Sequence, residues 1–155
     1  MTAILVGTPC YGGTVTIGYM HSLLNAIDLV GMPLHAVDRG DGDPLVIAGG
    51  HAAFNPEPIA DFIDAAILGD GERAVLKTSD LIREWKREGR PGGRTGLLER
   101  LARSGVAYVP AFYDVTYGPD GAISAVTPNR PGVPQRVAKH TLMDLDEWPY
   151  PKAPL

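Results

Sequence analysis

The chain has 155 residues, of which 45% are hydrophobic and 21% charged, as expected of one ordinary globular domain. Its 14 basic and 18 acidic residues give a net charge of −4, which leaves no electrostatic footprint for nucleic acid. No apolar run approaches the length of a transmembrane helix and the N-terminus lacks a signal-like pattern, so we expect a cytoplasmic protein with no membrane contact. The single cysteine, Cys10, excludes an internal disulfide and a cluster held by several cysteines.

The first part of the chain predicts a strand, a helix and a second strand. Residues 3–6 are apolar and end at a glycine, and residues 8–13 form a loop. From residue 17 to 30 the apolar side chains recur three and four positions apart, which indicates a helix with one buried face. After a glycine and a proline, residues 34–37 are expected to form the second strand and residues 38–43 a polar loop.

The stretch 44–72 predicts the centre of the fold. Residues 45–48 are apolar and partly β-branched, as in a strand buried on both faces, and residues 65–68 repeat the apolar pattern. Between them, Asn55 is a suitable N-cap for a short helix with Pro56 at its first position. A parallel pair of strands with a crossover helix follows from this order.

Each of these two strands ends in a glycine-rich turn that precedes a helix. Parallel strands joined by crossover helices point the same way, so both turns are expected at the same edge of the sheet. Open α/β sheets bind ligands at this edge, where backbone N–H groups are free of bulky side chains. We therefore predict a ligand-binding site formed by Gly49, Gly50, His51, Gly69, Asp70, Gly71 and Glu72.

The side chains of this site allow more than one role. His51 follows the first turn and either donates a hydrogen bond to the ligand or is a polar loop residue. Asp70 is expected to be the N-cap of the next helix. Glu72 lies where the helix dipole favours a negative charge, so a ligand hydroxyl or amide is a better partner than a phosphate. No catalytic residues and no metal ligands are predicted, because no triad or metal-binding spacing is present.

Two helices are expected next. Residues 73–88 have one apolar face, the run at 89–93 of glycine and proline ends that helix, and residues 95–103 predict a second, shorter one. The Arg and Lys residues between 83 and 103 are interleaved with acidic residues, which favours a solvated face over a phosphate-binding patch.

Alternation with period two indicates β-structure after these helices. Residues 112–117 and 122–126 predict a hairpin around the turn 118–121, which contains Pro and Gly. Residues 135–139 are a candidate third strand. The prolines that follow make 144–155 a semi-rigid linker.

Together these elements predict an α/β fold, with a Rossmann- or flavodoxin-like parallel sheet, a small C-terminal antiparallel β unit and a proline-rich linker. The expected parts are an α/β domain over residues 1–103, a β-hairpin unit over 104–140 and a linker over 141–155. The first 20 or so residues fit the β-α pattern but also read like the opening of a glycosyltransferase-type nucleotide-sugar domain.

The segment AGGHAAFNPEPIADFIDAAILGDGE resembles the second half of the cobalamin (B12)-binding-like domain that precedes the core of a class of radical S-adenosylmethionine (SAM) proteins. That class has Gly-Gly after one strand, Pro-Glu at the next helix and Gly-(Asp/Glu)-Gly-Glu after the following strand. The resemblance extends from about residue 23 to residue 155, and the tail MDLDEWPYPKAPL is similar to the linker into that core.

The resemblance implies that cobalamin is the cofactor, bound between the glycine turns and the catalytic core. The core would hold the [4Fe–4S] cluster and SAM through a CxxxCxxC motif, which this sequence lacks. We therefore expect a fragment that is not catalytic alone, whose partner is the missing core. No histidine here lies in the Asp-x-His-x-x-Gly motif of many cobalamin domains, so the cobalt would have no histidine from this chain.

Two other functions stay open from the sequence. The head of the chain favours a nucleotide-sugar-binding glycosyltransferase-like fragment that uses the loop 8–13. Alternatively, the absence of the axial histidine motif favours a cofactor-free interaction domain, in which the fold serves as a scaffold for the core. The reaction, the substrate and the oligomeric state do not follow from the sequence.

Overall fold

The computed structural model describes residues 3–7, 15–144 and 146–148. Its strands and longer helices, in chain order, are β1 (Ala3–Gly7), α1 (Val15–Leu29), β2 (Leu45–Gly49), β3 (Ala65–Ile67), α2 (Gly71–Arg87), α3 (Gly93–Arg103), β4 (Tyr113–Tyr117) and β5 (Ile123–Pro128). Short 3-10 helices lie between them, namely η1 (Ala36–Asp38), η2 (His51–Phe54), η3 (Glu57–Phe62) and η4 (Pro110–Phe112).

A parallel sheet forms the centre of the molecule. It contains β1, β2 and β3 in that order. Residues 45–48 and 65–67 are all buried, which explains why these strands consist of small or branched apolar residues. At the outer edge of β3 the chain returns in the opposite direction at Tyr108, whose backbone exchanges two hydrogen bonds of 2.7 and 2.8 Å with Ala66.

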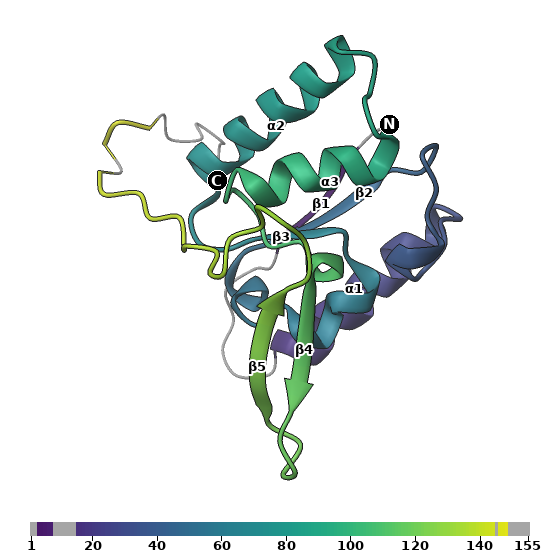
Figure 1. The fold of residues 1–155 in the computed structure, drawn as a ribbon, viewed down its shortest axis with the longest axis vertical. Helices are drawn as coiled ribbons and strands as arrows, with labels where there is room; N and C mark the ends of the chain where they lie inside the picture. The colour runs from purple at the N-terminus through teal and green to yellow at the C-terminus, as the bar shows by residue number, and fades with distance from the viewer. Residues whose placement is uncertain (1–2, 8–14, 145, 149–155) are drawn as a thin grey trace, which may run out of the picture.

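Helices cover both sides of this sheet, with α2 and α3 on one side and α1 on the other (Figure 1). Helix α2 buries Ala74, Thr78 and Trp85, and the indole N–H of Trp85 donates to the carbonyl of Pro91 at 3.1 Å. This hydrogen bond closes the glycine-rich connection to α3, whose leucines enter the core. The predicted pair of amphipathic helices is confirmed.

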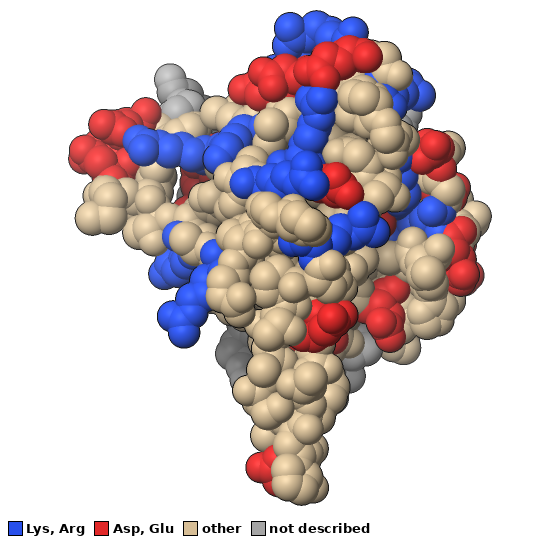
Figure 2. Space-filling model, viewed as in Figure 1, with Lys and Arg blue, Asp and Glu red and all other residues tan. Residues whose placement is uncertain are grey.

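The predicted β-hairpin is also confirmed and projects from the body of the protein (Figure 1). Its turn closes through two hydrogen bonds, from the N–H of Gly118 to Ala122 and from the N–H of Gly121 to Gly118. Gly121 has φ 79°, the left-handed conformation for which the sequence supplies glycine. Figure 2 shows few charged side chains on the hairpin, whereas both signs of charge cover α2 and α3. The α/β class with a parallel sheet and a separate antiparallel unit is therefore confirmed.

Three local predictions are wrong. Residues 34–37 do not form a strand: they lead into η1, and the side chain of Val37 is 88% exposed. Residues 135–139 do not form a strand either. Asn55 is not a helix N-cap, because two short 3-10 helices replace the expected α-helix and Pro56 holds the capping position of the second.

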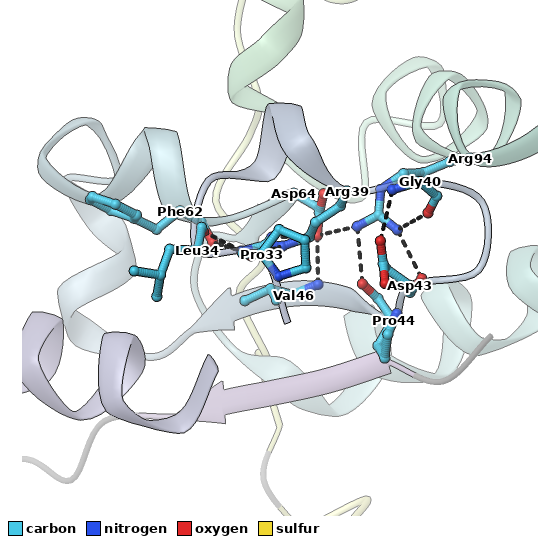
Figure 3. Close-up of polar contacts among 10 residues, drawn as sticks. All are labelled: Pro33, Leu34, Arg39, Gly40, Asp43, Pro44, Val46, Phe62, Asp64 and Arg94. Carbon is cyan, nitrogen blue, oxygen red and sulfur yellow. Dashed lines mark hydrogen bonds and ion pairs between the residues drawn. The ribbon is translucent and has the colours of Figure 1, made fainter. Parts of the chain in front are cut away.

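Strand β1 pairs directly with β2 because the intervening loop folds around the buried side chain of Arg39 (Figure 3). This side chain has 0% exposure. Its guanidinium donates to the carbonyls of Pro33, Leu34 and Phe62 at 3.0, 2.6 and 2.9 Å. The start of this predicted strand, at Leu34, therefore bonds a buried cation through its carbonyl instead of joining the sheet.

The carboxylate of Asp64 joins this loop to the sheet and to α3 (Figure 3). Its Oδ2 atom lies 3.0 Å from Arg39 Nη1 and 2.7 Å from Arg94 Nη2, and it accepts the backbone N–H of Val46 at 2.7 Å. Arg94 in turn donates to the carbonyls of Asp43 and Pro44. One oxygen thus fixes the entry of β2, the approach to β3 and the first turn of α3.

Replacing this carboxylate should therefore destabilise the whole domain. Asp64→Ala leaves two buried guanidinium groups without their anion, and removing one partner of a buried ion pair typically costs about 3–5 kcal/mol. Asp80→Ala is the matched control, since Asp80 forms an exposed pair with Arg83 and such pairs contribute about 0–1 kcal/mol. Urea unfolding of both variants measures the difference. Equal midpoints for the two variants would contradict the role given to Asp64.

Candidate functional site

The two glycine turns lie at the same edge of the parallel sheet. Gly49 at the end of β2 is in register with Ile67 at the end of β3, and the two strands run parallel. Each strand therefore leads into its turn at the same edge, which we call the carboxyl edge. Gly49 and Gly50 form the first turn, and residues 69–72 form the second.

The first turn contains a glycine with a positive φ, and both of its glycines are half-buried. Gly50 has φ 93° and ψ −172°, a conformation that side chains disfavour strongly. A methyl group on Gly49 would meet no atom of the described residues within 4 Å beyond its chain neighbours. The side chain of His51 lies outside the described part of the structure, and its hydrogen bond to a ligand stays a prediction.

The second turn, in contrast, is covered by the C-terminal part of the chain. Gly69 has φ 96° and pairs with His140 in a parallel bridge. The N–H of His140 donates to Leu68 at 2.8 Å, and the N–H of Asp70 donates to the carbonyl of His140 at 3.0 Å. A methyl group on Gly69 would lie 2.1 Å from that carbonyl oxygen. We call residues 139–142 the strap.

The remaining predicted site residues lie beside the strap. Asp70 holds the N-cap position of α2, as predicted, but its side chain makes no capping hydrogen bond. Its Oδ2 atom instead accepts the N–H of Leu142 at 2.6 Å. Gly71 is the first residue of α2, and Glu72 is exposed in its first turn. The cavity left between this turn and the strap has a volume of only 50 Å³.

Lys139 brings the strap into contact with the short helix η2, which follows the first turn. Its Cγ atom would lie 2.8 Å from a methyl group on Gly69. Its ammonium nitrogen lies 5.6 Å from the centre of the Phe54 ring, in the 3-10 helix that follows the first turn. Such a cation–π contact contributes about 0.5–1 kcal/mol at an exposed site. The strap therefore contacts elements at both ends of the predicted site.

Sequence reasoning missed the strap because its partners are distant along the chain. The bridge joins residues 69 and 140, and a single bridged residue has no period that a local pattern could reveal. Alternation over residues 135–139 did indicate an extended chain, which is the one local signal for this segment. The imidazole of His140 contacts the carbonyl of Val106 at 2.9 Å and so ties the strap to the body of the domain.

A larger cavity lies away from the carboxyl edge. It has a volume of 570 Å³ and lies between η1, η3, the start of α3 and β4. At its border the Tyr108 hydroxyl donates to the carboxylate of Glu57. Burial, together with this contact, raises the pKa of Tyr108 well above its ordinary value, so the hydroxyl keeps its proton and acts as a donor.

The expectations for the loop 8–13, the linker, metal ligands and membrane spans concern other parts of the chain. The loop 8–13, on which the nucleotide-sugar hypothesis depends, and residues 149–155 of the predicted linker lie outside them. Within the described ranges, no group of three or more His, Cys, Asp or Glu side chains could hold a metal ion. No helix there is long and apolar enough to cross a membrane.

Comparison with known proteins gives one match. A sequence model of the family described as "Radical SAM proteins, N-terminal" matches residues 16–110. The matched region contains α1 apart from its first residue, β2, β3, both glycine turns, α2 and α3. No curated protein and no solved structure matches the chain.

The two turns should respond differently to the same substitution. Gly69→Ala places a methyl group against the strap and imposes a positive φ on alanine, which costs about 1–3 kcal/mol. Gly49→Ala adds the same methyl group to open space, so the free energy of unfolding should stay within about 1 kcal/mol of the original. Chemical denaturation of both variants measures this contrast. A Gly69→Ala protein as stable as Gly49→Ala would show that the strap does not contact this turn.

Proposed function

This chain belongs to the family of radical SAM N-terminal domains, and from that premise we propose that it is an accessory domain which binds a ligand at its carboxyl edge and presents it to a catalytic core. The observation that carries the proposal is the pair of positive-φ glycines, Gly50 and Gly69, after neighbouring parallel strands. Turns of this kind let a ligand approach the main chain closely.

The chemistry itself belongs to the core. Radical SAM chemistry needs SAM and a [4Fe–4S] cluster, and such clusters are held by several cysteine thiolates. This chain contains a single cysteine and so cannot hold the cluster by itself. What its own residues contribute under this proposal is binding and orientation of the ligand.

Cobalamin is the ligand that the sequence resemblance implies, and the carboxyl edge fits it only in part. At the first turn, the positive φ of Gly50 and the described space around Gly49 favour the close approach of a ligand to the main chain. The second turn does not fit while the strap is in place, because the His140 carbonyl fills the space in front of Gly69. The 50 Å³ left there is far below the roughly 300–1,000 Å³ typical of small-molecule sites.

A cofactor-free interaction domain is the second candidate function. The covered second turn favours it, since the chain's own backbone already satisfies the N–H of Asp70 that a ligand would use. In that case the carboxyl edge serves to anchor the segment that the sequence predicts to lead into the core. The two candidates differ in whether any ligand reaches the edge.

Titration with hydroxocobalamin separates these candidates. We expect weak, saturable binding, because the strap covers one turn and the core is absent, and no protein-imidazole signature in the spectrum. Gly50→Val should abolish binding, since its side chain blocks the first turn and disfavours positive φ. Gly105→Val is the matched control, because Gly105 also has positive φ, 68°, but lies at the end of α3.

Far-UV circular dichroism establishes first that both variants fold. Uridine and guanosine diphosphates with Mg²⁺ are titrated in parallel and should not bind. Saturable nucleotide binding without corrinoid binding would contradict the proposal and support the nucleotide-sugar hypothesis. Binding of neither ligand would favour the cofactor-free candidate.

A further inference from the structure

We propose that the strap, residues 139–142, is a built-in closure of the carboxyl edge that opens as a local unit, and that a ligand reaches the second turn only when it leaves. The inference rests on the proposed function, because it names how access to that same site is regulated. It also accounts for the difference between Gly49, which meets no described atom, and Gly69, which the strap covers.

The strap occupies the positions that a ligand would use. The carbonyl of His140 accepts the N–H of Asp70, the residue that precedes α2, at 3.0 Å. The N–H of Leu142 donates to the Asp70 carboxylate at 2.6 Å, so both the N–H and the carboxylate of Asp70 are already bonded to the strap. Ligand contacts at this turn and strap contacts are therefore mutually exclusive.

The strap can leave without unfolding the domain. None of its four residues belongs to the buried apolar core. It pairs with the chain just beyond β3, at Gly69, through one isolated bridge rather than a ladder, and its neighbour Met143 is 91% exposed. Regions with few buried contacts and short hydrogen-bonded ladders open locally at lower free energy than the core.

Release of the strap would also change how the following segment is held. Beyond the strap, the chain is anchored to α2 by an exposed ion pair of 2.9 Å between Arg73 and Glu147. Exposed pairs of this kind are weak. The strap and this ion pair are thus two described attachments of the segment that the sequence predicts to lead into the core, and release of the strap would couple ligand binding to the position of that segment.

The test compares three proteins, the 155-residue chain and two of its variants. His140→Pro removes the N–H that donates to Leu68 and the imidazole that contacts Val106, which releases the strap. Met143→Pro is the matched control, with the same new residue at an exposed position three residues further along. Hydrogen exchange of each protein is measured with and without hydroxocobalamin, and hydroxocobalamin binding is titrated.

In the original protein, the amides of Asp70, His140 and Leu142 should exchange together and faster than those of β2 and β3. In His140→Pro the protection at Asp70 and Leu142 should disappear while the sheet stays protected. The apparent Kd for hydroxocobalamin should fall at least about tenfold, because it equals the intrinsic Kd divided by the open fraction. Met143→Pro should behave like the original protein.

The remaining outcomes distinguish a failure of the strap as a closure from a failure of cobalamin as the ligand. Equal corrinoid binding by all three proteins, or binding that leaves exchange at Asp70 and His140 unchanged, would overturn the strap as a closure. Strap amides that exchange only with the whole sheet would overturn its local opening. No corrinoid binding to a folded His140→Pro protein would overturn cobalamin as the ligand, whereas the exchange data would still decide local opening.

Discussion

The fold depends on one carboxylate oxygen. Oδ2 of Asp64 lies within 3.0 Å of two guanidinium groups, and the Asp64 side chain is 2% exposed. In so dry an environment each charge requires its partners, because desolvation of an unpaired ion costs several kcal/mol. The two guanidinium groups donate most of their remaining N–H groups to backbone carbonyls. These polar contacts around the sheet therefore all connect to the Asp64 carboxylate (Figure 3).

This arrangement sets the position of the carboxyl edge. Asp64 accepts the N–H of Val46 at the start of β2, and Val46 pairs in register with Ile4 of β1. The same aspartate immediately precedes β3, so the two strands begin from a common anchor and end side by side. The two glycine turns are neighbours for that reason, and the strap contacts the second turn and the 3-10 helix η2 that follows the first.

Local sequence patterns predicted the elements that depend on residues close together in the chain. The apolar runs at 45–48 and 65–68 gave strands, because burial on both faces requires continuous apolar side chains. Glycine and proline at 118–121 likewise predicted the hairpin turn, where Gly121 has the positive φ that a turn requires. The placement of two glycine turns at one edge followed from topology alone.

The failures share a different cause, which is a partner far along the chain. Arg94 lies among charged residues that suggested a solvated face, yet it is buried because Asp64, 30 positions earlier, neutralises it. Arg39 likewise turned the expected strand at 34–37 into a loop. No periodicity within one segment reports that a distant carboxylate is present, and the same limit concealed the pairing of Gly69 with His140.

The closed carboxyl edge is tested most directly by the proton–proton contact between Gly69 and His140 in solution. Because Gly69 and His140 form a parallel bridge, we expect a strong nuclear Overhauser effect between an α-proton of Gly69 and the amide proton of His140. Residues 139–142 should also show chemical shifts of an extended chain. Random-coil chemical shifts for these residues, and no nuclear Overhauser effect between His140 and Gly69 while the sheet resonances are intact, would contradict the closed carboxyl edge.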